Sequence, residues 1–434
     1  MTQNETRLAS SLRAGVSRVV ITPPVGAMLT GFFTRATGSV GVRDPLYATA
    51  LVVESGGSRV ALLGCDLLWV HPSLVAEVRA GVEEATGIPG ANVMICCSHT
   101  HSGPPGYIHP NARSVDNAYV AVLRYLLIGA VAAAARELRP VTLHHGVSAC
   151  AAAINRREVR PDGRVVLGHN PTGPRDALAR VARLDRADGR PLVSIINYAC
   201  HPVTLGPASM EISSDWVCHM RSVVEGALGG SVLFVQGTCG DVNPRLGPAA
   251  DEGQTQIVGL EVAGAVLQAS ATAQPATSHG VAAATAGLVL PLMEDISAIP
   301  DLMSDGDRRA ITSFVDQRIP WAAEVVDNPA GGGQAVPIEL QALRIGGLRL
   351  VGLPMEPFSA IGLALRESPP GGMIMPAGYA NGCVGYVPTA DAYALGGYEV
   401  ATSFAYFRLP RPLAPQCAQL VIAQGLRLLQ QVAG

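Results

Sequence analysis

The chain has 434 residues, of which 48% are apolar and 15% are charged, and its formal net charge is -3. This length is sufficient for a large hydrophobic core. Because the charge is nearly balanced, the composition argues against a nucleic-acid partner and favours a small-molecule substrate, and it leaves a homo-oligomer open.

Strand and helix patterns alternate along the chain. Short apolar runs predict strands over residues 18–21, 48–54, 59–65 and 92–95, and periodic apolar spacing predicts helices over 72–86 and 117–138. Further on we predict strands over 193–200 and 232–236, a helix over 255–269, a charged helical excursion over 299–327, a hairpin of 338–345 with 348–353, and a closing helix over 417–432. This pattern predicts an α/β fold, with a mixed β-sheet core flanked by helices, in a single domain over residues 1–434.

The chain shows no pattern typical of export or membrane insertion. Residues 1–7 lack a basic start followed by an apolar stretch, so we expect a cytoplasmic protein. The longest uncharged apolar run, residues 125–135, is about half of the ~20 residues that a membrane span needs. The nine cysteines show no CxxC spacing, which favours buried, reduced thiols over disulfides or a cysteine zinc site.

The most informative segment is SHTHSGPPG, residues 98–106. Side chains two residues apart on a strand lie on the same face, so His99 and His101 are expected to point toward one place. The glycine and proline residues that follow end the strand in an irregular loop, where functional residues often lie. The pattern is typical of a metal site, with hydrogen-bonded loop histidines as the alternative.

Two later strands end in similar residues. His201 follows the apolar run that ends at Cys200, and Glu356 follows the predicted hairpin. A single histidine after a strand is usually structural, and a single glutamate there often serves a helix N-terminus. The coincidence of these residues with the histidine pair favours a metal centre.

Six short blocks in order resemble the catalytic domain of the neutral/alkaline ceramidases, which are zinc amidases. The blocks are SHTHSGPPG (98–106), INRR (154–157), HPVT followed by SSDW (201–204 and 213–216), GTCGDVNP (237–244), LPMEPF (353–358) and NGCVGYVPT (381–389). The resemblance implies a zinc amidohydrolase fold. It also implies a zinc ion held by His99, His201, Glu356 and Tyr386.

The same resemblance implies roles for residues around the metal. His101 would lie beside the first ligand, and Arg156 would bind substrate. Three carboxylates would stand behind the ligands and fix the histidine tautomers, namely those of Asp66, Asp215 and Asp241. For Arg156 the alternative is a surface ion pair with Glu158 or Asp162.

The chain departs from the family pattern in two ways. Asn243 stands where the family has a serine with a nucleophilic or polarising role, and an amide cannot be acylated as a serine can. We therefore expect attack by zinc-bound water, with Asn243 either donating to the oxyanion or serving as a turn residue before Pro244. The family also adds a C-terminal immunoglobulin-like domain, whereas this chain ends in the helix predicted over 417–432, so ceramide itself is not the expected substrate.

Together with the resemblance, these patterns predict a zinc-dependent hydrolase of an amide, lactam or N-acyl bond in a small, polar substrate. Tyr386 would stabilise the oxyanion, and His101 would carry the proton to the leaving nitrogen, with Asp241 as the alternative acid and base. The competing functions are a zinc-dependent lyase or isomerase and a non-catalytic family member that keeps only the metal.

Overall fold

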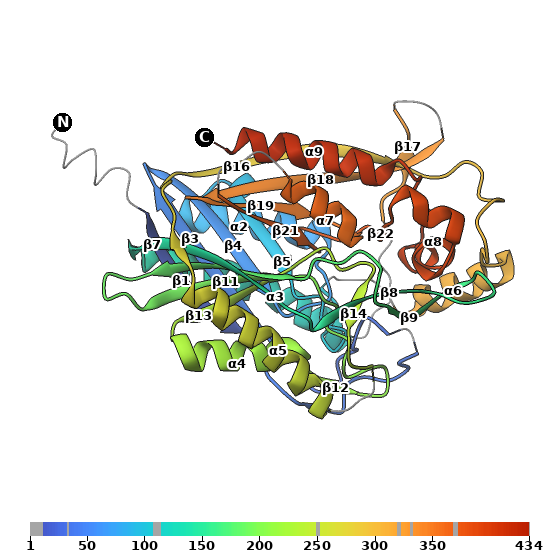
Figure 1. The fold of residues 1–434 in the computed structure, drawn as a ribbon, viewed down its shortest axis with the longest axis horizontal. Coiled ribbons are helices and arrows are strands. Elements are labelled where there is room, and N and C mark those ends of the chain that lie inside the picture. Colours follow the sequence, from blue (N-terminus) through green and yellow to red (C-terminus); the bar gives the residue numbers. More distant parts are fainter. Residues whose placement is uncertain are drawn as a thin grey trace.

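The computed structural model describes residues 12–32, 34–106, 114–248, 252–318, 323–329, 333–367 and 372–433. Three large sheets dominate the described part of the chain, with helices on their outer faces (Figure 1). This arrangement confirms the predicted α/β class with a mixed-sheet core.

The three large sheets are built by the same order of six elements. The first unit contains β1 (Arg13–Val20), β3 (Tyr47–Ser55), β4 (Ser58–Cys65), α2 (Pro72–Thr86), β5 (Val93–Cys97) and α3 (Ser114–Arg136). The second contains β7 (Thr142–Ala149), β10 (Leu178–Asp185), β11 (Pro191–Tyr198), α4 (Trp216–Leu228), β13 (Ser231–Gln236) and α5 (Glu252–Ala271). The third contains β16 (Val281–Pro291), β18 (Gln334–Ile345), β19 (Leu348–Leu353), α7 (Ser359–Arg366), β21 (Met373–Gly378) and α9 (Cys417–Gln431).

Each unit has three antiparallel strands and then a helical crossover to a parallel strand. The parallel pairs are β4 with β5, β11 with β13, and β19 with β21. A crossover of this kind requires a helix, which explains why α2, α4 and α7 recur at the same place. The internal repeat escapes the sequence analysis because the insertions between equivalent elements differ in length.

The remaining elements are short or lie at the edges. They are β2 (Gly41–Val42), β6 (Arg139–Pro140), β8 (Ala153–Val159), β9 (Val165–Asn170), β12 (Glu211–Ile212), β14 (Val242–Pro244), β15 (Gln274–Pro275), α6 (Asp305–Arg318), β17 (Val326–Asp327), β20 (Glu356–Pro357), β22 (Tyr386–Val387), α8 (Tyr398–Ala401), and the 3₁₀ helices η1 (Gly90–Asn92), η2 (Ala390–Leu395) and η3 (Ser403–Phe407).

Most of the predicted elements are confirmed to within a few residues. Helix α2 has the predicted bounds because Pro72 occupies its first turn and Gly87, at φ 70°, ends it in the left-handed conformation. The predicted excursion over 299–327 is wrong in extent: α6 covers only Asp305–Arg318, residues 319–322 lie outside the described part, and β17 is a strand. All nine cysteines are unpaired, as expected.

The inner faces of the three sheets meet in one apolar core. Fully buried side chains from each unit form it, among them Leu51, Leu62, Ile195, Leu233, Leu343 and Leu350. Because all three sheets share this core, the ends of their parallel strands are brought together. Loops that leave those ends carry the candidate site residues.

Among the described helices, one is long and apolar enough to cross a membrane, judged by length and composition alone. It is α3, over Asp116–Arg136. This extent exceeds the apolar run expected from the sequence. Its inward side chains Leu123, Leu127 and Val131 are buried in the core, where the helix packs on β1 and β3. Packing against this sheet accounts for the apolar character of that side of the helix.

Candidate metal centre

Two imidazoles and a carboxylate from three different units meet at the junction of the sheets. His99 follows β5, His201 follows β11, and Glu356 follows β19. The Nε2 atom of His99 lies 3.3 Å from Oε2 of Glu356, and Nε2 of His201 lies 3.5 Å from the same oxygen. All three side chains are buried. The structure thus brings together three of the residues that the sequence analysis singled out.

The hydrogen bonds of the two imidazoles leave their Nε2 lone pairs directed at this carboxylate. Nδ1 of His99 donates to the carbonyl of Leu68 at 3.0 Å, and Nδ1 of His201 donates to the carbonyl of Val242 at 2.9 Å. Burial lowers the pKa of His201 to about 4, so this ring is neutral near pH 7. Acceptor atoms that converge in this way require a proton or a cation between them, and the donor set fits zinc.

His101 adds a third imidazole to this group. Its Nε2 lies 3.2 Å from Nε2 of His99, and the three histidines together offer ligand atoms within 4.8 Å of one another. Within the described residues, the buried Nδ1 of His101 has no hydrogen-bond partner. The geometry therefore allows His101 either to complete a metal site or to move a proton beside it.

The histidine pair converges for a reason other than the predicted strand alternation. Strand β5 ends at Cys97, two residues before His99. His99 has φ 66°, a left-handed conformation that is unusual for this residue type. A stacked Tyr379 ring, with centroids 3.8 Å apart, packs against the His99 ring. The loop, rather than the strand, aims both rings.

Tyr386 lies beside Glu356 because β20 and β22 pair in parallel, with these two residues in register. NH2 of Arg156 donates to the Tyr386 hydroxyl at 3.1 Å. Burial raises the pKa of Tyr386, so its hydroxyl remains protonated near neutral pH and can donate a hydrogen bond. Its position suits either a ligand or an oxyanion donor.

Arg156 is buried, so the surface ion pair with Glu158 or Asp162 is wrong. Its Nε donates to Glu399 at 2.8 Å, and its NH1 donates to Oδ1 of Asn243 at 3.3 Å. The same NH1 lies 3.5 Å from Nε2 of His201. Arg156 thus forms part of the pocket wall and also lies next to the candidate ligand His201.

Asn243 lies in strand β14, which pairs with β8, so it is a strand residue rather than the turn residue considered from the sequence. Because Arg156 donates to its Oδ1, the Nδ2 group of Asn243 remains available as a donor. The residue also lines the pocket described below. An amide donor at this point can contact the oxygen of a bound carbonyl group.

The aspartates expected to fix the histidine tautomers do not contact the rings in the described part of the chain. Main-chain carbonyls take that role. Asp66 pairs with Arg221 at 2.7 Å, and Asp215 caps α4 and accepts from the amide groups of Thr204 and Leu205. Asp215 thus holds the loop that carries His201, whereas Asp66 ties the start of the β4–α2 loop to α4 and β3.

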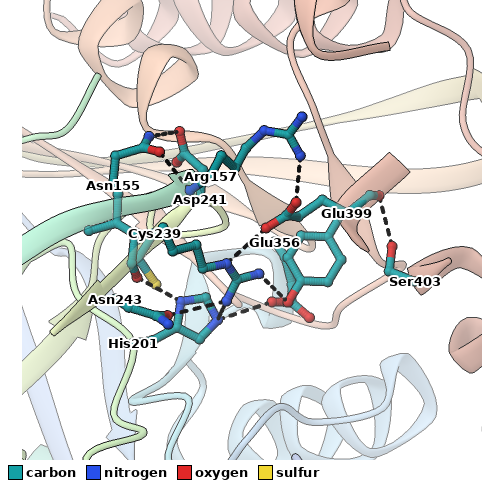
Figure 2. A network of polar contacts seen from close by, with 12 residues as sticks. Asn155, Arg157, His201, Cys239, Asp241, Asn243, Glu356, Glu399 and Ser403 are labelled. Carbon is teal, nitrogen blue, oxygen red and sulfur yellow. Dashed lines mark hydrogen bonds and ion pairs between the residues drawn. The ribbon is translucent and has the colours of Figure 1, made fainter. Parts of the chain in front are cut away.

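Asp241 likewise faces away from the histidines. Its carboxylate accepts a hydrogen bond from the side chain of Asn155 (Figure 2). It also accepts from the amide and hydroxyl of Ser359. Burial raises the pKa of Asp241 to about 6. These contacts give Asp241 a positioning role behind Arg156, whose amide donates to the Asp241 carbonyl at 2.8 Å.

A pocket of about 450 Å³ opens beside the candidate metal centre. His101, Arg156, Asn243 and Tyr386 supply polar groups, while much of the remaining wall is apolar or aromatic: Phe32, Leu167, Val203, Pro207, Pro244, Pro248, Tyr398 and Tyr406. This volume falls within the usual range for small-molecule sites. Four residues named from the sequence therefore share one cavity.

The sequence analysis missed Tyr379, Tyr398 and Glu399. Tyr379 stacks on His99 and donates to Glu356 at 3.4 Å, and Tyr398 lines the pocket. Glu399 is buried between two arginines. One signal was present: the adjacent Arg156 and Arg157, if buried, require a carboxylate partner from elsewhere in the chain.

Buried imidazoles and a carboxylate beside a substrate-sized pocket define an α/β protein with a candidate catalytic metal centre. Residues 12–259 match the sequence profile of the neutral/alkaline non-lysosomal ceramidase N-terminal domain. The chain belongs to this family of amide-hydrolysing enzymes.

Two solved structures have the same fold. Neutral ceramidase from Pseudomonas aeruginosa superposes with a TM-score of 0.72 at 19% identity, over 98% of this chain and 75% of that one. A ceramidase complexed with C2 gives a TM-score of 0.74 at 19% identity, over 97% and 76% of the two chains. At this identity the likeness establishes the fold and leaves the substrate to be inferred from the pocket.

Proposed function

We propose that the protein is a zinc-dependent hydrolase that cleaves an amide or related carbon–nitrogen bond in a small substrate. The observation that carries the proposal is the convergence of two imidazole lone pairs on the Glu356 carboxylate, beside a pocket lined by His101, Arg156 and Tyr386. His99, His201 and Glu356 would hold the ion, since three protein ligands with an open fourth position are typical of a catalytic zinc. When bound, zinc supplies a Lewis acid for the carbonyl and lowers the pKa of a water molecule to about 7.

The chain's own residues have distinct roles in this reaction. The Tyr386 hydroxyl accepts from Arg156, which leaves its proton free to bind the oxygen of the carbonyl as negative charge develops there. His101 accepts a proton from the attacking water and returns it to the leaving nitrogen. One water is consumed, and one carboxylic acid and one amine are formed.

The pocket narrows the class of substrate. Its polar groups can face an amide, whereas the aromatic and proline walls favour an apolar group attached to that amide. We therefore propose a compact N-acyl compound or lactam rather than a uniformly polar substrate. The volume of about 450 Å³ is suited to a molecule of ordinary metabolite size.

The direct test is a panel of small amides and N-acyl compounds incubated with the zinc-loaded protein in isotopically labelled water. Hydrolysis adds the mass of one water across the two products, and the label enters the acid. Products without added water would instead indicate a lyase or an isomerase. Stoichiometric zinc without turnover over the whole panel would favour the non-catalytic alternative.

Asn243→Ala is expected to lower kcat by about 100-fold, because removal of one oxyanion donor typically costs that much or more. The fold should be retained, since Asn243 sits on a short strand and its side chain contacts Arg156. The measurement is kcat together with the melting temperature. A lower melting temperature at unchanged kcat would assign the residue a purely structural role.

The matched variant is Asn243→Ser, which introduces the residue expected from the family pattern. Because Asn243 cannot form an acyl-enzyme, the wild type should show no burst with a chromogenic amide. A stoichiometric burst in the wild type would contradict direct attack by water.

A further inference from the structure

Glu399 is a buried carboxylate directly behind the pocket, and it pairs with two consecutive residues of β8. Arg156 Nε donates to Oε1 at 2.8 Å, and Arg157 NH1 donates to Oε2 at 2.5 Å. Neighbouring side chains on a regular strand point to opposite faces. A shift in the pairing of β8 with β9 between Asn155 and Arg157 marks an irregularity at this point.

The bond to Nε determines how the Arg156 guanidinium is turned. This group is planar and presents its donors in a fixed fork. With Nε held by Glu399, NH1 reaches Oδ1 of Asn243 and NH2 reaches the hydroxyl of Tyr386. Glu399 therefore sets the direction of two pocket donors through one arginine.

Glu399 also balances the charge beside the candidate ligands. Arg156 NH1 lies 3.5 Å from Nε2 of His201, and the arginine side chain is 6% exposed. A buried cation without a counter-charge would repel a metal ion held by His201. The Glu399 side chain is fully buried, at 0% exposed, so solvent screens its charge little.

We propose that Glu399 is a positioning residue that aims Tyr386 and Asn243 through Arg156 and offsets the arginine charge next to the metal site. The effect on turnover rests on the proposed function, whereas the effect on zinc affinity does not require that the substrate be known. Glu399 itself does not line the pocket in the described part of the chain.

A purely structural role is the competing explanation. Arg157 joins Glu399 to the carbonyls of Ala392 and Gly396, and Ser403 donates to the Glu399 carbonyl. Loss of these contacts would loosen the segment around α8 without any specific effect on the metal. The test must therefore distinguish a loss of stability from a loss of side-chain orientation in the pocket and of charge balance at the metal site.

The experiment compares Glu399→Gln with Asp176→Asn, which neutralises another buried carboxylate paired with Arg180 at 2.7 Å outside the pocket. Zinc affinity is measured by competition with a chelator, and kcat, KM and melting temperature are measured in parallel. In Glu399→Gln we expect zinc affinity and kcat each to fall about 10–100-fold, as for residues that support metal ligands. In Asp176→Asn only the melting temperature should fall.

A double-mutant cycle with Arg156→Met tests the proposed route. If Glu399 acts through Arg156, Glu399→Gln should lower kcat little further in the Arg156→Met background. Additive losses would overturn the proposal, as would wild-type zinc affinity and kcat in a folded Glu399→Gln protein.

Glu399→Asp keeps the charge but shortens the side chain, and it carries the test if the glutamine variant does not fold. We expect it to keep near wild-type zinc affinity and to lose kcat with little change in KM. An unchanged kcat in Glu399→Asp would show that Glu399 does not orient Tyr386 and Asn243. A fall in zinc affinity as large as that expected for Glu399→Gln would show that Glu399 does not act by balancing the Arg156 charge. A wild-type protein that binds no zinc would overturn the proposed function and this inference together.

Discussion

His201→Ala should abolish zinc binding and reduce turnover to background. The wild type is expected to bind one zinc per chain, because His99, His201 and Glu356 come from three sheets and meet only in the folded state. Removal of one imidazole leaves too few ligands for a catalytic zinc. Elemental analysis after dialysis measures the metal directly, without reference to any substrate.

A thermal measurement supplies a second readout. Zinc that binds only the native state raises the melting temperature of the wild type by mass action, and His201→Ala should lose this increase. His279→Ala, which alters an exposed histidine, is the matched control and should keep both zinc and its thermal effect. Stoichiometric zinc in His201→Ala would show that the proposed ligand set is wrong.

The sequence specified the individual elements better than their assembly. Apolar periodicity and end signals located α2, which is buried on one side and bounded by Pro72 and Gly87. Continuous apolar runs located β4 and β19, which are mostly or wholly buried. The repetition of six elements was not visible, because the insertions between equivalent elements differ in length. Strands β8 and β9 were also missed, because their burial is irregular.

The site shows the same division between local and distant information. His99, His201 and Glu356 could be singled out because each follows an apolar run, and the run becomes a core strand whose end is fixed. The tautomers could not be foreseen, since the carbonyls of Leu68 and Val242 belong to loops whose paths depend on the fold. The aspartates were therefore assigned to the rings, whereas Asp215 and Asp241 bind the segments that follow His201 and Glu356, and Asp66 pairs with Arg221.

Buried charge explains why Glu399 escaped detection. Nothing near α8 distinguishes this glutamate from one at an exposed helix start. Its partner Arg156 lies 243 residues away in the chain. Only the folded structure shows that two arginines and one glutamate share a region from which water is excluded.

Tyr386→Phe tests the chemistry of the pocket independently of its assembly. If the hydroxyl stabilises the developing oxyanion, kcat should fall by about 100 to 1000-fold, as for loss of one preorganised donor. The Tyr386 ring packs against Tyr398, with centroids 5.7 Å apart, and phenylalanine preserves that contact. Steady-state kinetics on the zinc-loaded variant give the measurement.

The variant also decides between the two positions that the geometry allows for Tyr386. A donor to the oxyanion can be removed without loss of metal, so zinc content should stay at one per chain while kcat falls. A direct ligand would take zinc affinity down with it. A packed aromatic residue with no role in catalysis would lose only one hydrogen bond to Arg156, worth about 1 kcal/mol of stability. Near wild-type kcat in a folded, zinc-loaded Tyr386→Phe protein would thus eliminate the hydroxyl from the reaction, and the oxyanion would then depend on Asn243 and the metal alone.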